Sequence, residues 1–433
     1  MKKVLLGTLA VLTLAACSID EVVQQNPNDA ITFSVVTNKA VSRAANGYCN
    51  KHMPKNFSVW ARVGAVNYFE GETYKQETEG ATNTKYVIAG GVTRYWPESG
   101  SVDFFAAKNY QVDPTWDAAT GLKLENFTVI NKVSGAAAED EVKGSTVAQN
   151  DFIYAVLAGA TKNADGYNST PLNFHHGLSQ IVFKLKNQNK NIYVKATGVK
   201  VMNVKNNGTF TFPIKTTKDN VEDHTNPQNT DAKESEWGTW ALTTALDSYT
   251  ATFAEVGAKK QDDAYSLTYN FSEGKEYNDN AMYLMPQSFS SAETTADNTK
   301  LWNGTDALKK TDPTDPFKKV YKTDCGAYVI LTCKIFNVAK PSDTDLNGGY
   351  VDGTDIALWG GTTAKDIAVA LPSAASWKWE QGKKYVYTFV FTATGNGGTD
   401  PDTDKPVFTP IKLEVTVDDF VGETDTELEM DDK

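Results

Sequence analysis

The chain has 433 residues, enough for two or three domains, and its 40% hydrophobic and 22% charged residues are typical of an ordinary globular protein. Its formal net charge of −12 becomes −12 − 2 = −14 once two lysines near the N-terminus leave with a leader, so nucleic acid is not expected as a partner. Glycine, tyrosine and phenylalanine are plentiful and long helical patterns are few, which predicts an all-β protein.

The N-terminus has the pattern of a targeting segment. Lys2 and Lys3 precede the apolar run 4–14, which is too short to remain as a membrane-spanning helix. The run ends in Leu-Ala-Ala-Cys, which resembles a lipobox, the motif in which the cysteine is lipidated and becomes the first residue. We therefore predict a signal peptide over 1–16 and lipid attachment at Cys17, which would hold the precursor on the outer membrane. The alternative is an ordinary secretory signal with a chance cysteine.

The first strand is expected at 31–36, where Ile31, Phe33 and Val35 lie on one face and alternate with polar residues. A polar loop follows. Near the other end of the chain, four apolar residues alternate with polar ones in the same way: Ile411, Leu413, Val415 and Val417. The two segments could therefore fill the same kind of slot in a sheet.

Many short strands separated by turns are expected between these two segments, a pattern that favours β-sandwiches. A cluster of turn-forming residues at 165–171 indicates a domain boundary, and the polar segment 395–406 is expected to be a linker. The main predicted strands cover 59–68, 102–106, 151–158, 181–186, 194–204, 240–253, 328–336 and 367–371. The segment 377–391 is predicted to be two strands joined by a tight turn at 381–382.

No residues in the sequence point to a metal, a cofactor or enzymatic catalysis. Cys325 and Cys333 lie in one predicted strand, roughly 26 Å apart, so no disulfide is expected between them, and Cys333 should be a buried core residue. The adjacent His175 and His176 should point to opposite faces of a strand, which favours a structural role. The segment 343–348 resembles half of a calcium loop, but the glutamate that should follow is replaced by threonine.

An ordered series of segments resembles the fimbrillin family, the type V pilins and pilin-like lipoproteins of the Bacteroidia. The series begins with the lipobox and the ITFSVV strand with its following SRA. It continues with YWPESGSVDFFA, DFIYA, LNFHHGLSQIVFKL, MYLMPQSF, WEQGKKYVYTFVF and IKLEVTVDDF, at 95–106, 151–155, 172–185, 282–289, 379–391 and 411–420. These segments span almost the whole chain.

The resemblance implies two transthyretin-like β-sandwich domains with Greek-key-type topology. It divides the chain into a signal peptide at 1–16, a propeptide with a removable first strand at 17–43, an N-terminal domain at 44–171, and a C-terminal domain with a terminal donor strand at 172–433.

The resemblance also implies a function. A protease would cut after Arg43, so that Ala44 becomes the N-terminus and the strand with Ile31, Phe33 and Val35 leaves. The strand that begins at Ile411 in another subunit would then fill the slot. Lys39 is a rival cleavage site. The expected partners are further pilin subunits and accessory fimbrial subunits, and the expected location is a fimbria on the cell surface.

One other function remains open from the sequence. Nine tryptophans and 19 tyrosines leave room for a monomeric surface lipoprotein that binds glycans by aromatic stacking.

Overall fold

Strands account for nearly all the regular structure of the described residues. The computed structural model describes residues 29–37, 54–78, 85–117, 121–129, 132–133, 149, 151–162, 169–213, 237–258, 264–267, 281–291, 298–338, 355–372, 377–393 and 397–419. These ranges contain no α-helix, and hence none that could cross a membrane. The predicted sites Cys17, Lys39, Arg43 and Ala44 lie outside them.

The N-terminal part is a closed barrel with strand order β1-β10-β9-β5-β2-β3-β4. The strands are β1 (Phe33–Thr37), β2 (Asn56–Val63), β3 (Val66–Gln76), β4 (Tyr86–Ile88), β5 (Val102–Lys108), β9 (Ile153–Ala160) and β10 (Thr170–His176). The single strand predicted at 59–68 is wrong, because Gly64 takes a positive φ of 59° and turns the chain there, so that β2 and β3 form a hairpin.

Two larger sheets form the C-terminal part and share one hydrophobic core. The first contains β11 (Ser179–Asn187), β16 (Tyr265–Ser266), β17 (Met282–Leu284), β26 (Lys383–Phe391) and β29 (Ile411–Asp419). The second contains β8 (Lys132–Val133), β12 (Ile192–Lys205), β15 (Leu246–Ala258), β22 (Tyr328–Asn337), β23 (Ala357–Trp359), β24 (Lys365–Ala370), β27 (Thr399–Asp400) and β28 (Lys405–Pro406). The prediction of an all-β protein with β-sandwich architecture is confirmed.

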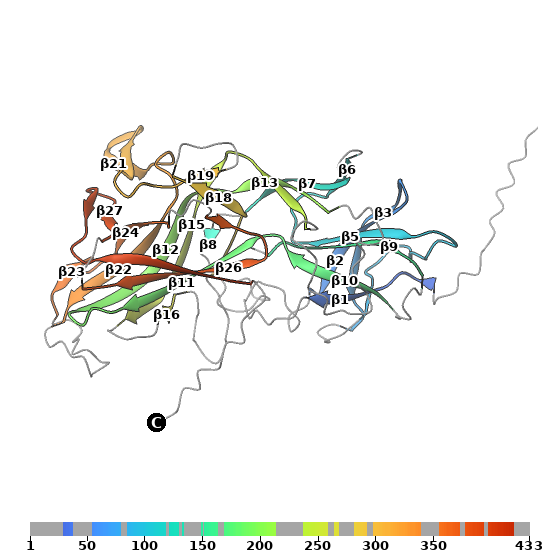
Figure 1. The fold of residues 1–433 in the computed structure, drawn as a ribbon, viewed down its shortest axis with the longest axis horizontal. Helices are drawn as coiled ribbons and strands as arrows, with labels where there is room; N and C mark the ends of the chain where they lie inside the picture. Colours follow the sequence, from blue (N-terminus) through green and yellow to red (C-terminus); the bar gives the residue numbers. More distant parts are fainter. Residues whose placement is uncertain are drawn as a thin grey trace, which may run out of the picture.

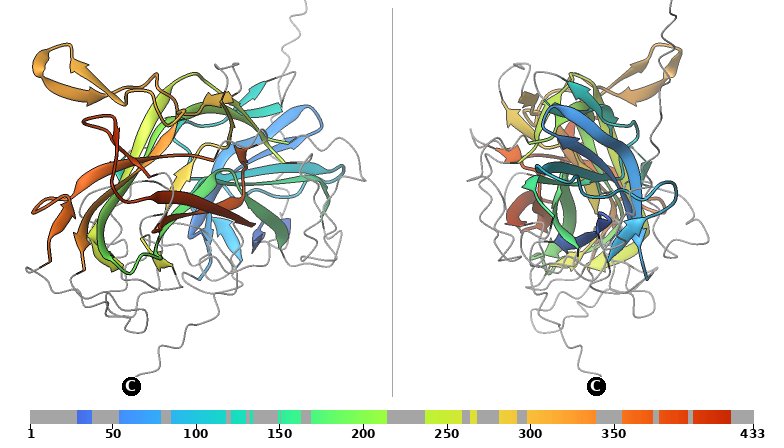
Figure 2. Two further views of the ribbon diagram at one scale, coloured as in Figure 1. Left: turned by 60° about the vertical axis from the view of Figure 1, so that its left-hand side comes forward. Right: turned by 90° about the vertical axis from the view of Figure 1, so that its right-hand side faces the viewer.

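Three small sheets complete the fold. They are formed by β6 (Thr115–Asp117), β7 (Gly121–Thr128), β13 (Asn207–Thr211) and β14 (Thr239–Leu242); by β18 (Gln287–Ser290), β19 (Asn298–Lys300) and β25 (Lys378–Trp379); and by the hairpin of β20 (Lys309–Asp312) and β21 (Asp315–Tyr321). The barrel lies at one end of the elongated molecule and the two larger sheets lie at the other, as Figure 1 shows. The β20–β21 hairpin projects from the body (Figure 2).

The predicted domain boundary between residues 171 and 172 falls within β10. Moreover, β7 pairs with β13 and β8 pairs with β15, so these earlier segments belong to sheets built with later strands. We propose that the N-terminal unit consists of the barrel alone and that the segment 115–133 belongs with the C-terminal sheets.

The linker predicted at 395–406 is wrong for residues 397–406, which fold as the β27–β28 hairpin. Its turn needs little apolar burial, because Asp400 accepts hydrogen bonds from the Asp402 N–H (2.9 Å) and the Thr403 hydroxyl (2.9 Å). The hairpin extends the second large sheet, where Thr399 pairs with Ala368 of β24.

Both described cysteines are free and buried, so the expectation of no disulfide between Cys325 and Cys333 is confirmed. Cys333 has no exposed surface, and burial raises the pKa of its thiol well above the ordinary range. It is a small core residue, as its position in the alternating strand predicts.

Candidate functional site

The first described strand of the chain occupies an interior slot of the barrel. β1 pairs in parallel with β10 over five positions, from Phe33 opposite Thr170 to Thr37 opposite Phe174, and on its other side Phe33 pairs with Tyr86 of β4. Because β1 precedes every other described strand, it is joined to the rest of the barrel only through the segment 38–53. A cut anywhere in that segment would leave β1 held by non-covalent contacts alone.

The predicted inward face of β1 faces the core of the barrel. Ile31 and Phe33 are buried and Val35 packs against the same cluster, while Thr32 and Ser34 are only partly covered. The alternation read from the sequence is therefore present in the structure. The removable role of the strand stays a prediction.

An aromatic pocket encloses the side chain of Phe33, which has 0% exposed surface. Its ring makes edge-to-face contacts with Tyr74, Phe104 and Phe57, at centroid distances of 4.7, 5.1 and 6.2 Å. These three residues come from β3, β5 and β2, so the pocket joins three barrel strands around one ring. Each such pair contributes about 0.5–1.5 kcal/mol beyond area burial.

Backbone hydrogen bonds hold the N-terminal end of β1 on both sides. The Ile31 N–H donates to the Arg94 carbonyl (2.8 Å), and the Thr170 N–H donates to the Thr32 carbonyl (2.8 Å). The Trp96 N–H donates to the carbonyl of Asp29 (3.0 Å). An empty slot would leave some of these groups without a partner beside an apolar trench, and both are unfavourable in water.

The predicted donor strand, β29, lies at an edge of its sheet. It pairs with β26 over nine positions, and its other edge faces no strand of the described part of the chain. Burial decreases along it: Ile411 is 3% exposed, Leu413 and Val415 are partly buried against the main core, and Val417 is 47% exposed. A strand with one free edge and such weak burial at its far end can separate more easily than a central strand.

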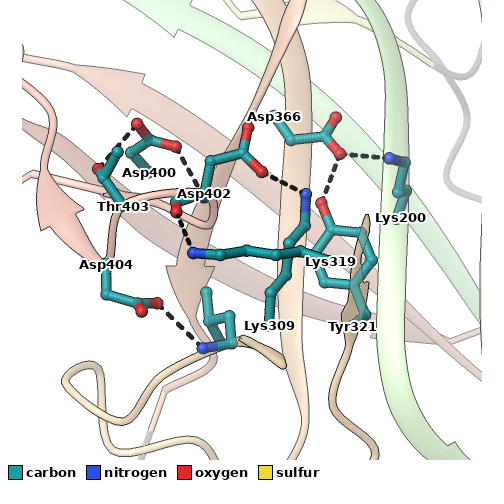
Figure 3. Close-up of polar contacts among 10 residues, drawn as sticks. Lys200, Lys309, Lys319, Tyr321, Asp366, Asp400, Asp402, Thr403 and Asp404 are labelled. Atoms are coloured by element: carbon teal, nitrogen blue, oxygen red, sulfur yellow. Dashed lines mark hydrogen bonds and ion pairs between the residues drawn. The ribbon is translucent and has the colours of Figure 1, made fainter. Parts of the chain in front are cut away.

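The hairpin immediately before β29 is fixed by polar contacts. The Lys309 ammonium forms an ion pair with the Asp402 carboxylate (2.7 Å), and the Lys319 ammonium donates to the Asp402 carbonyl (3.0 Å). The Leu308 N–H donates to the carboxylate of Asp404 (3.1 Å). Figure 3 shows these contacts, which join the β27–β28 hairpin to both strands of the β20–β21 hairpin and to the residue before it.

A carboxylate on β24 ties the same β20–β21 hairpin to the sheet. Asp366 accepts hydrogen bonds from the Tyr321 hydroxyl (2.6 Å) and the Lys200 ammonium, both drawn in Figure 3. It also accepts one from the Thr332 hydroxyl (2.6 Å). Burial acts to raise the pKa of Asp366, but the three hydrogen bonds outweigh it and hold the pKa below the ordinary value. The network therefore needs the ionised carboxylate.

The two adjacent histidines point in different directions, as expected for a strand. His176 Nδ1 lies 2.6 Å from a carboxylate oxygen of the buried Asp151, whereas the ring of His175 packs near Tyr154 and Trp237. Within the described residues no group of three histidine, cysteine, aspartate or glutamate side chains could hold a metal ion. The half calcium loop at 343–348 lies outside the described ranges.

The structure places the two predicted strands in different sheets. β1 belongs to the barrel and β29 to the first large sheet, so one molecule does not bring them together. Sequence reasoning did not identify Phe57, Tyr74 and Phe104 as the lining of the Phe33 pocket. The aromatic run in the predicted strand at 102–106 was the one available signal.

Comparison with known proteins identifies the family. A sequence profile described as fimbrillin-like matches residues 42–307. The chain belongs to the fimbrillin-like family. Since this is a family of fimbrial proteins rather than of enzymes, the chain is assigned to the fimbrial proteins of the cell surface.

Several solved structures are similar to this fimbrillin-like chain, and two of them are described as fimbrial proteins. One is a fimbrial protein from Bacteroides vulgatus, with 11% identity, a TM-score of 0.42, and coverage of 90% of this chain and 99% of that one. The other is the tip fimbrial protein Mfa3 from Porphyromonas gingivalis, determined with a C-terminal truncation, with 9% identity, a TM-score of 0.34, and coverage of 90% and 99%. No curated protein gives a significant match. At these TM-scores the assignment rests on the profile match.

Loss of the Asp366 network should weaken the fold in a pH-dependent way. Because the folded-state pKa is depressed, ionised Asp366 contributes stability above its unfolded pKa of about 3.9, and this contribution disappears as the pH falls through the folded-state value. We expect Asp366→Asn to lower the free energy of unfolding by about 2 kcal/mol at pH 7, and by progressively less as the pH falls from about 4 through the folded-state pKa. Urea unfolding at several pH values measures this, with the exposed Asp324 changed to Asn as control. An effect of equal size at all pH values would contradict the role of the charge.

Removal of the Phe33 ring should destabilise the protein. Phe33→Ala empties the aromatic pocket, and we expect the free energy of unfolding to fall by about 3–5 kcal/mol. Ser34→Ala, on the partly covered face of the same strand, should change it by less than about 1 kcal/mol. Denaturant unfolding of the uncleaved protein measures both. Equal losses for the two variants would show that the pocket does not hold β1.

Proposed function

We propose that this fimbrillin-like protein is a structural subunit of a fimbria that polymerises by donor-strand exchange. The precursor is lipidated on Cys17 and exported to the outer membrane. A protease cuts after Arg43, so that Ala44 becomes the N-terminus and β1 leaves the barrel. β29 of another subunit then enters the empty slot, and the polymer supports adhesion and biofilm formation.

The observation that carries the proposal is the position of β1. It is the first described strand of the chain, yet it has strand partners on both sides and an enclosed aromatic side chain. A single cut behind it therefore separates a whole interior strand from the barrel. A strand from another molecule with the same alternation can satisfy both the backbone groups and the apolar trench, as in other strand-addition assemblies.

The edge position of β29 supports the same proposal. It is an edge strand whose partner β26 is also paired with β11, so the first large sheet keeps its core pairing when β29 leaves. The exposed Lys412–Glu414 ion pair on β29 contributes little to holding it in place.

The glycan-binding alternative gains no support from the tryptophans. All nine lie in the described part of the chain, and each is buried or partly buried rather than exposed. An exposed tryptophan platform for sugar stacking is therefore not available.

Cleavage should be the step that allows assembly. We expect an arginine-specific protease to convert the purified precursor into a form that begins at Ala44 and that forms oligomers resistant to mild SDS, since Arg43 is the one arginine in the segment 38–53. Arg43→Ala should prevent both the cut and the oligomers, whereas Lys39→Ala should leave both unchanged. N-terminal sequencing identifies the cut, and gel electrophoresis identifies the oligomers.

A chain without β29 distinguishes proteolytic cleavage from strand exchange. A chain that ends at Pro410 keeps the barrel but lacks β29, so it should be cut normally and remain monomeric. Oligomers of this truncated chain would overturn the donor role of β29. Persistent monomers of the cleaved full-length chain would overturn the proposed function as a whole.

A further inference from the structure

The dimensions of the β1 slot determine how a second copy can enter it. This inference rests on the proposed function and specifies the partner strand residue by residue. The slot has three inward positions, now filled by Ile31, Phe33 and Val35. Registers of β29 in this slot that keep its apolar face inward differ from one another by an even number of residues, because a slip of one residue would bury Lys412 and Glu414.

One register of β29 reproduces the side chains of β1 most closely. With Ile411 in the place of Ile31, Leu413 enters the Phe33 pocket and Val415 takes the place of Val35. Two of the three inward positions then hold the same residue as before. The remaining change, from phenylalanine to leucine, leaves a small void among the rings that line the pocket.

The neighbouring registers fit less well. If Leu413 took the place of Ile31, Val415 would enter the Phe33 pocket, and this smaller side chain would leave a larger void than leucine does. If Ile411 entered the Phe33 pocket instead, Thr409 would take the place of Ile31, which is 2% exposed, and its hydroxyl would be buried in an apolar site.

Pro410 determines the direction of the incoming strand. If β29 runs as β1 does, Pro410 takes the place of Ala30, which precedes the β10 ladder that begins at Phe33. The bridge between Ala30 and Tyr95 uses the Ile31 N–H and the Asp29 carbonyl, so it needs no N–H at position 30. If β29 ran the opposite way with Leu413 in the pocket, Pro410 would lie opposite Asn173 within the ladder, where its missing N–H is unfavourable.

We propose that β29 of a second copy enters the slot in the direction of β1, with Leu413 in the pocket of Phe33. In this arrangement Thr416 lies opposite Asn173 of β10, at the position that Val36 now occupies. Neighbouring Cα atoms in a sheet lie within the distance that a disulfide or a short thiol crosslinker can bridge.

Crosslinking between two copies tests the register. In a Cys49→Ser background, a cleaved Asn173→Cys chain is mixed with a Thr416→Cys chain, with an Asp418→Cys chain as the matched control, and then oxidised. We expect a crosslinked dimer with Thr416→Cys and at least about tenfold less with Asp418→Cys, because two residues shift the thiol by about 7 Å. Preferential crosslinking through Asp418→Cys, or oligomers without crosslinking at Thr416→Cys, would overturn the register and leave the proposed function standing. A failure of all cleaved chains to form oligomers would instead refute the proposed function.

Pocket filling provides an independent measurement. Leu413→Phe restores the ring that the pocket encloses in the precursor, so its oligomers should dissociate about tenfold more slowly in warm SDS than those of the unaltered chain. Val415→Phe should accelerate dissociation, because it places a ring where Val35 fits. The reverse order of the two variants would indicate the register shifted by two residues and would overturn the proposal.

Discussion

The enclosure of one aromatic ring by three others is the interaction on which the position of β1 depends. Phe33 connects the first described strand to Tyr74, Phe104 and Phe57, which come from three separate strands of the barrel. The same contacts that hold β1 in the barrel also shape the slot that a partner strand would fill in the proposed assembly. The geometry of the barrel core would thus serve both stability and recognition.

The strand that fills the slot and the strand proposed to replace it differ in how firmly the protein holds them. β1 has partners on both sides and a fully buried ring, whereas β29 lies at an edge and becomes more exposed toward its end. A polymer that depends on exchange needs this asymmetry, since the donor must leave its own sheet readily while the slot remains closed until a covalent bond is cut. The difference in burial between β1 and β29 provides this asymmetry, and no further structural element is needed.

Local patterns in the sequence predicted the inward face of β1 correctly, and that of β29 for Ile411, Leu413 and Val415, whereas Val417 is exposed. The period of two at Ile31, Phe33 and Val35, and again from Ile411, follows from strand geometry alone and needs no knowledge of the partners. The lining of the Phe33 pocket could not be predicted in this way, because Phe57, Tyr74 and Phe104 are brought together by pairing between distant segments. The hairpin at 397–406 was missed for another reason. Its turn is stabilised by hydrogen bonds from a backbone N–H and a hydroxyl to Asp400. A prediction based on apolar content alone cannot detect stabilisation of this kind.

The anchoring of the β27–β28 hairpin determines how far a subunit can extend. Asp402 and Asp404 hold it against the start of the β20–β21 hairpin, so the part of the chain free to swing out begins only a few residues before Ile411. Successive subunits joined through such a short arm would have little slack between them. Bending of the resulting fibre would therefore be resisted at every junction between subunits, and the fibre would be stiff.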